Sequence, residues 1–146
     1  KKIKLHEFVT HIIDDSKKDM AWTIGDHGFD LKLSVYVPSL IQKNIHNILT
    51  LILSKSGLTQ EGVDIWAIHP GGRRILEKFE EELALDKEDL AYSYEVLRNY
   101  GNMSSVSIMY VLKNLLEQHQ YPGQIFAAAF GPGLTVESAH MELMSG

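Results

Sequence analysis

Apolar and polar residues change their spacing several times along this 146-residue chain, and each change marks an expected element. Residues 20–37 alternate apolar with polar and are interrupted by Gly25-Asp26-His27-Gly28, which predicts two strands joined by a turn. From Pro38 onward, apolar residues recur every three or four positions until Ser56-Gly57, which predicts a helix. The next apolar run, residues 63–68, is short and indicates a buried strand.

Helical and extended patterns also alternate in the second half of the chain. Five further elements are expected there, namely helices over 73–83, 86–100 and 104–112 and strands over 124–130 and 135–141. Asp86 is the expected N-cap of the second of these helices. The two strands flank the turn Gly131-Pro132-Gly133, whose glycines and proline favour a reversal of the chain.

The stretch from Ser104 to Leu112 is unusual because it has no charged residue, so no side of the expected helix is suited to water. A helix of this kind belongs between two layers. The element order over residues 1–146 predicts one mixed α/β domain with a mixed sheet packed by helices. Its buried central helix needs a second layer to cover it.

Composition narrows the classes of function. With 45% hydrophobic and 23% charged residues, the chain has the profile of a soluble globular protein. A net charge of −5 with scattered Lys and Arg excludes nucleic acid as a partner, and no apolar run is long enough to span a membrane. The basic start does not continue as a signal peptide, and the chain has no cysteine, so we expect a cytoplasmic protein. His6-Glu7 and His11 lack the spacing of a zinc motif, so no metal site is expected.

Two uncharged side chains stand out as candidates for catalysis. His69 follows the expected strand 63–68 and precedes Pro70-Gly71-Gly72, a position where α/β sheets present ligand-binding residues. Asn102 lies between Gly101 and the start of the uncharged helix, where the helix dipole favours developing negative charge. Taken singly, His69 has the character of a turn residue and Asn102 that of a helix cap. Together they suggest an oxyanion site.

Three motifs resemble the C-terminal half of type III polyketide synthases, the chalcone and stilbene synthase family. They are His69-Pro70-Gly71-Gly72, Tyr100-Gly101-Asn102-Met103-Ser104-Ser105 and Phe130-Gly131-Pro132-Gly133-Leu134-Thr135-Val136-Glu137. Residues 20–41 also resemble the bacterial members, so that only about the first dozen residues fall outside the resemblance.

The resemblance implies a thiolase-like fold, of which this chain is the C-terminal half, and a Cys-His-Asn triad. His69 and Asn102 match the His and Asn of the family, whereas the nucleophilic Cys belongs to the N-terminal half, which this chain lacks. The implied reaction is a decarboxylative Claisen condensation of malonyl-CoA onto an acyl-CoA starter. The implied partners are these two coenzyme A thioesters, with no other cofactor, the N-terminal half and a second copy in a homodimer.

The resemblance also assigns binding residues. Gly71 and Gly72 imply a close approach to the pantetheine arm of coenzyme A, and Arg74 lies near the mouth of the site, where a cation attracts phosphate. The segment Gly131-Pro132-Gly133 resembles the loop lining the cyclisation cavity. Leu31 occupies the position of a gate that is usually Phe in plant members. Similarity to bacterial members implies a fatty acyl starter and an alkylpyrone or alkylresorcinol product.

Two alternatives remain open at this stage. One is a condensing enzyme like ketoacyl-acyl carrier protein synthase III, which shares the fold and the Cys-His-Asn set but not Met103 or Phe130-Gly131-Pro132-Gly133. The other is a non-catalytic interaction domain with the same fold, against which the retention of both His69 and Asn102 argues. On the enzyme reading, the chain alone is expected to be inactive, because it lacks the nucleophile.

Overall fold

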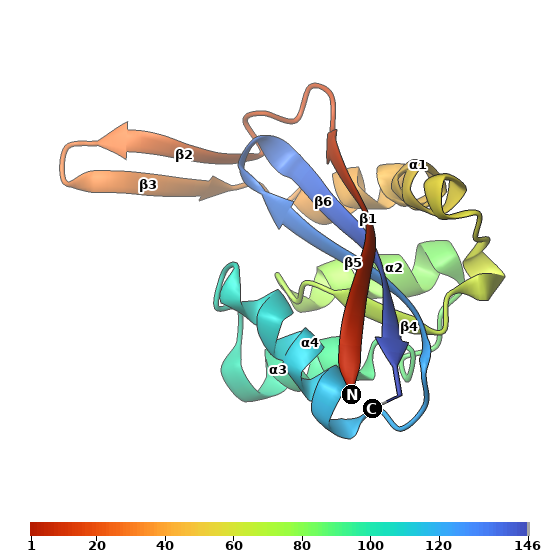
Figure 1. Ribbon diagram of the computed structural model, residues 1–146. Helices are drawn as coiled ribbons and strands as arrows, with labels where there is room; N and C mark the ends of the chain where they lie inside the picture. The colour runs from red at the N-terminus through yellow and green to blue at the C-terminus, as the bar shows by residue number, and fades with distance from the viewer. Residues whose placement is uncertain (146) are drawn as a thin grey trace.

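A computed structural model describes residues 1–145 and shows a four-stranded sheet with helices on both faces and a separate two-stranded hairpin (Figure 1). The sheet has the order β1-β6-β5-β4 and consists of β1 (Lys2–Ile12), β4 (Ile65–Ile68), β5 (Gly123–Gly131) and β6 (Thr135–Met144). β4 and β5 are parallel, and the other neighbours are antiparallel. The expected mixed α/β class and thiolase-like fold are confirmed.

The hairpin consists of β2 (Met20–Gly25) and β3 (Gly28–Leu33), which project from the rest of the molecule (Figure 1). Its strands pair from Met20↔Leu33 to Gly25↔Gly28, so Asp26 and His27 form a two-residue turn. The expected hairpin is therefore present, although its second strand ends before Val37, where the first helix begins.

Helices cover the two faces of the sheet in pairs. They are α1 (Val37–Ser56) and α2 (Arg73–Leu83) on one face and α3 (Ala91–Tyr100) and α4 (Val106–Gln118) on the other, with short 3₁₀ turns η1 (Gln60–Gly62) and η2 (Pro132–Leu134). The strands alternate between these layers because successive side chains point to opposite faces. Trp66 and Ile68 pack with α1 and α2, whereas Ile65 and Ala67 pack with α3 and α4.

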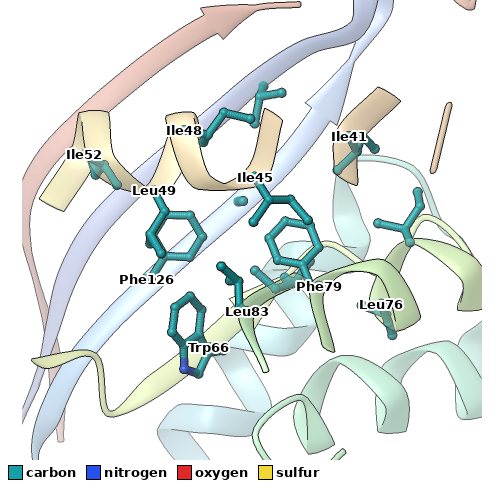
Figure 2. Packing of buried hydrophobic residues seen from close by; sticks show 14 of the residues in the cluster. Ile41, Ile45, Ile48, Leu49, Ile52, Trp66, Leu76, Phe79, Leu83 and Phe126 are labelled. Atoms are coloured by element: carbon teal, nitrogen blue, oxygen red, sulfur yellow. The ribbon is translucent and has the colours of Figure 1, made fainter. Parts of the chain in front are cut away.

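The layer of α1 and α2 holds the larger core. Figure 2 shows the isoleucines of α1 facing the aromatic and leucine side chains of the sheet and of α2. Trp66 and Phe126 come from the paired strands β4 and β5, and their ring centroids are 5.4 Å apart. Burying each such side chain contributes about 1.5–3 kcal/mol, so this layer anchors β4 at the edge of the sheet.

The sequence patterns did not indicate β1. It pairs antiparallel with β6 from Lys2↔Met144 to Ile12↔Thr135, with a shift of register between Leu5 and Glu7. A β-bulge of this kind breaks the alternation of side chains that identifies a strand in sequence. One face of β1 is also exposed, including Leu5 and Phe8, so its apolar residues do not form a simple buried pattern.

Three expected boundaries were wrong for local reasons. Asp86 is not an N-cap: its own N–H donates to the Asp89 carboxylate at 2.8 Å, and α3 begins later, at Ala91, without a side-chain cap. β4 begins at Ile65 instead of residue 63, because Val63 N–H donates back to the Gln60 carbonyl at 3.0 Å and so closes the preceding turn η1. α4 continues to Gln118, beyond the uncharged stretch.

α4 is covered on one side only. Ser107, Val111 and Leu115 are buried against the sheet and α3, whereas Val106 and Met109 are 46% and 62% exposed. Apolar side chains therefore face solvent along a helix that carries no charge in its first two turns. Within residues 1–145, no helix combines the length and apolar character needed to cross a membrane.

Candidate active site

The two glycine-rich turns lie against each other at one end of the sheet. His69 directly follows β4, and Gly131 ends the parallel strand β5, so both lie at the carboxyl edge where α/β sheets present ligand-binding residues. Asn102 follows α3, and its Nδ2 donates a hydrogen bond to the carbonyl of Gly71 at 2.9 Å. This bond joins two motifs that lie 31 residues apart in the sequence.

His69 is held by its backbone and is 7% exposed. Its N–H donates to the carbonyl of Ala128 in β5 at 2.8 Å, and its own carbonyl accepts from Gly71 N–H at 2.8 Å. Nδ1 is buried without a hydrogen-bond partner among the described residues. Burial lowers the pKa of His69, so the imidazole is neutral at neutral pH and offers one ring N–H as a donor.

The side-chain amide of Asn102 is fixed at both ends. Oδ1 accepts from Ser104 N–H at 2.9 Å, while Nδ2 donates to Gly71 through one of its two N–H groups. The turn is fixed further by Met103 N–H, which donates to the buried Ser107 hydroxyl at 2.7 Å. Gly101 has φ 70° and ψ −161°, a conformation open almost only to glycine. The orientation of the Asn102 amide is thus fixed by the bonds of this turn.

The predicted binding residues Gly71, Gly72 and Arg74 line one pocket of about 240 Å³. Leu33 and the start of α1 complete its wall. A larger pocket of about 580 Å³ lies against α3, but it contains none of the predicted site residues. The smaller pocket is the relevant one, because it adjoins the turn that carries His69.

The predicted cavity loop lies against the hairpin. Gly131, Pro132 and Gly133 lead from β5 through η2, which contacts β2, and Gly133 has φ 76°. Leu31 lies on β3 opposite Trp22 and is 50% exposed. The structure therefore places the loop beside the hairpin that carries Leu31.

No group of three or more His, Cys, Asp or Glu side chains within residues 1–145 is arranged to hold a metal ion. The imidazole of His69 and the amide of Asn102 both lie against Gly71, and both side chains are neutral donors. Two neutral donors suit an oxygen on which negative charge develops during a reaction.

One residue beside the site, Ser93, was not predicted from the sequence. Ser93 is fully buried in α3, and its hydroxyl donates to the carbonyl of Ile68 at 2.7 Å and accepts from Ile68 N–H at 3.2 Å. The signal in the sequence is its spacing from Leu90 and Val96, which are also fully buried. A serine at such a core-facing helix position has a hydrogen bond to satisfy.

Comparisons with known proteins agree on one family. The sequence model of the family described as chalcone and stilbene synthases, C-terminal domain, matches residues 4–145. The alpha-pyrone synthesis polyketide synthase-like Pks18 of Mycobacterium tuberculosis is 32% identical over 98% of this chain. Type III polyketide synthase B of Arabidopsis thaliana is 33% identical over 92%. In the crystal structure of PKS-I from the brown alga Ectocarpus siliculosus, the matching part has a TM-score of 0.84 and 31% identity over 97% of this chain.

The matches also show how much of a relative this chain represents. It spans 37% of the Mycobacterium and Arabidopsis proteins and 40% of the chain from the brown alga. At its start, the family match reaches residue 4, so the expectation that the first dozen residues fall outside the family was wrong. These residues form β1, which is part of the four-stranded sheet.

Proposed function

The chain belongs to the chalcone and stilbene synthase family, and from this premise we propose that it supplies the His and Asn of a Cys-His-Asn triad in a type III polyketide synthase. The observation that carries the proposal is the hydrogen bond from Asn102 Nδ2 to the Gly71 carbonyl, which joins the two turns that carry the candidate donors. The absence of cysteine from all 146 residues is consistent with a nucleophile in the remaining part of the enzyme.

In the proposed reaction, His69 first stabilises the thiolate that attacks the acyl-CoA carbonyl. Burial alone lowers the pKa of His69 in this chain, whereas a neighbouring thiolate favours the imidazolium. Thiolate and imidazolium then form an ion pair. As the enzyme thioester forms, coenzyme A leaves as a thiol that takes the proton of the His69 imidazolium, and the imidazole is neutral again.

Extension follows with the acyl group on the thiol. Malonyl-CoA loses CO₂, and the electron pair of the broken bond becomes an enolate whose oxygen accepts hydrogen bonds from His69 and Asn102. The enolate carbon attacks the acyl thioester, a carbon–carbon bond forms and the thiolate is released. Both donors are neutral at this stage, so neither quenches the enolate by giving up a proton.

The rest of the enzyme is the proposed partner of the exposed apolar surfaces. Val106 and Met109 of α4 and the apolar face of the hairpin need a cover that residues 1–145 do not provide. We assign that cover to the N-terminal half, and we propose that the complete enzyme is a cytoplasmic homodimer using coenzyme A thioesters without another cofactor. Gly71, Gly72 and Arg74 then bind the coenzyme A moiety in their shared pocket.

The proposed product is an alkylpyrone or alkylresorcinol made from a fatty acyl starter. Its support is the similarity to the relative whose name refers to alpha-pyrone synthesis. Leu31 gates the cyclisation cavity, and Gly131, Pro132 and Gly133 line it. Strict dependence of the complete enzyme on a malonyl-carrier protein instead of malonyl-CoA would contradict this assignment.

Two substitutions in the complete enzyme test the triad. His69→Ala should abolish both acyl loading and malonyl-CoA decarboxylation, because the imidazole serves both steps. Asn102→Ala should leave loading intact and slow decarboxylation roughly 100- to 1000-fold, the usual cost of removing one oxyanion donor. Loading is measured by intact mass, and decarboxylation by release of labelled CO₂. Equal loss of loading in both variants would contradict these roles.

A further inference from the structure

We propose that Ser93 is a positioning residue that sets the distance between His69 and Asn102. The inference rests on the proposed function, since it concerns how the two donors of that site are held. In this proposal, Ser93 does not contact the substrate. It acts through the backbone of Ile68, the residue directly before His69.

The starting point is that β4 is an edge strand. It pairs with β5 only, and His69 N–H points across to the carbonyl of Ala128 in β5. Neighbouring residues of a strand turn their N–H and C=O groups in opposite directions, so those of Ile68 point away from the sheet. Ile68 is fully buried, and its two groups therefore need a partner other than water.

One hydroxyl satisfies both groups. Ser93 Oγ donates to the Ile68 carbonyl at 2.7 Å and accepts from the Ile68 N–H at 3.2 Å, which replaces the neighbouring strand that β4 lacks. Ser93 itself is fully buried between α3 and the sheet, so water does not compete for these bonds. The hydroxyl thus fixes the end of β4 just before the catalytic turn.

The same hydroxyl links the two halves of the site. α3 carries Ser93 near its start and leads at its end into Gly101 and Asn102. β4 leads directly into His69. Ser93 ties this helix to this strand, and the bond from Asn102 to Gly71 closes the connection at the other end. These two connections between α3 and β4 determine the separation of His69 and Asn102. Loss of the Ser93 hydroxyl removes one of them.

The test compares Ser93→Ala with Ser138→Ala in the complete enzyme. Ser138 is the matched control, because it is also buried and its hydroxyl donates to a strand carbonyl, that of Val9, at 3.1 Å on the opposite edge of the sheet. Both variants should lower the melting temperature. Only Ser93→Ala should lower kcat for condensation, by roughly 10- to 100-fold, since small misplacements of catalytic groups cost this much. KM for malonyl-CoA should stay within about threefold, because the substrate-binding turn is intact.

Ser93→Thr keeps the hydroxyl and should restore most of kcat, an outcome that a merely structural role does not predict. If Ser93→Ala does not fold, Ser93→Cys replaces it, with a weaker donor and an intermediate kcat expected. Equal kcat in the Ser93 and Ser138 variants would overturn the inference while His69→Ala remains inactive. Normal activity of His69→Ala would instead refute the proposed function.

Discussion

The space around His69 is filled so closely that a side chain on the next glycine in the chain would press on its neighbours. A Cβ at Gly71 would lie 3.0 Å from Ile75 Cδ1 and 3.3 Å from His69 Cδ2. Ile75 is buried in α2, so a side chain at Gly71 would press on the imidazole as well as on the end of Ile75. A Cβ at Gly72 would meet nothing within 4 Å. Adjacent glycines thus make different contributions to the site.

We expect Gly71→Ala to lower kcat of the complete enzyme by roughly 10- to 100-fold, because the imidazole is displaced from its productive position. Gly72→Ala should keep kcat near that of the unmodified enzyme and change at most KM for malonyl-CoA. Steady-state kinetics of the two variants measure the difference. Similar kcat values for both would show that close packing against His69 is not needed.

Among single residues, the sequence singled out His69 and Asn102 as candidates because each lies in a glycine-rich turn beside a helix. It did not reveal Ser93, because a single serine among apolar helix residues has many explanations. Nor did it reveal the bond from Asn102 to Gly71, which depends on how α3 packs on β4. The sequence indicated the candidate side chains, but it did not predict hydrogen bonds between groups that lie far apart in the chain.

Two elements present apolar surface that residues 1–145 leave uncovered. On the hairpin, Ile24 and Phe29 are paired across the strands and are 87% and 71% exposed. On α4, the side chain of Met109 is exposed to solvent, whereas those of Val111 and Leu115 are buried. Contiguous apolar surface of this kind marks an interaction site in folded proteins.

We expect Met109→Lys to disrupt the complete enzyme, because a charge would be buried where the second half covers α4. The isolated chain carrying the same substitution should instead become more soluble. Leu51→Lys is the control, since Leu51 lies 42% exposed on the outer side of α1. Yield and gel filtration of both variants measure the effect. A well-folded, active Met109→Lys enzyme would show that α4 is not covered there.

The elements with simple periodic patterns were the ones that the sequence predicted. α1 and α2 bury apolar residues at intervals of three and four, and both were expected. β1 was missed because the bulge after Leu5 and an exposed face obscure its alternation. Asp86 was misread as a cap because the sequence shows which residue is able to cap but not which backbone N–H it meets.

For the whole molecule, we expect the isolated chain to form no product from acyl-CoA and malonyl-CoA, because neither thiol nor thiolate is present among its 146 residues. It should also be poorly soluble. Co-expression with the N-terminal half of the enzyme should restore condensation, measured as labelled product. Product from the isolated chain would show that the reaction proceeds without a cysteine.

The pairing of β1 with β6 has a consequence for the order of folding. Lys2 lies opposite Met144, and Ile12 lies opposite Thr135, so the first strand of this sheet in the sequence pairs with the last strand of the same sheet. Contacts between such distant segments form slowly, since a long loop must close before they are gained. Because β1 pairs only with β6 in this sheet, its backbone groups stay unpaired until the other three strands have been made. An early-exposed strand of this kind is where we expect chaperones to bind.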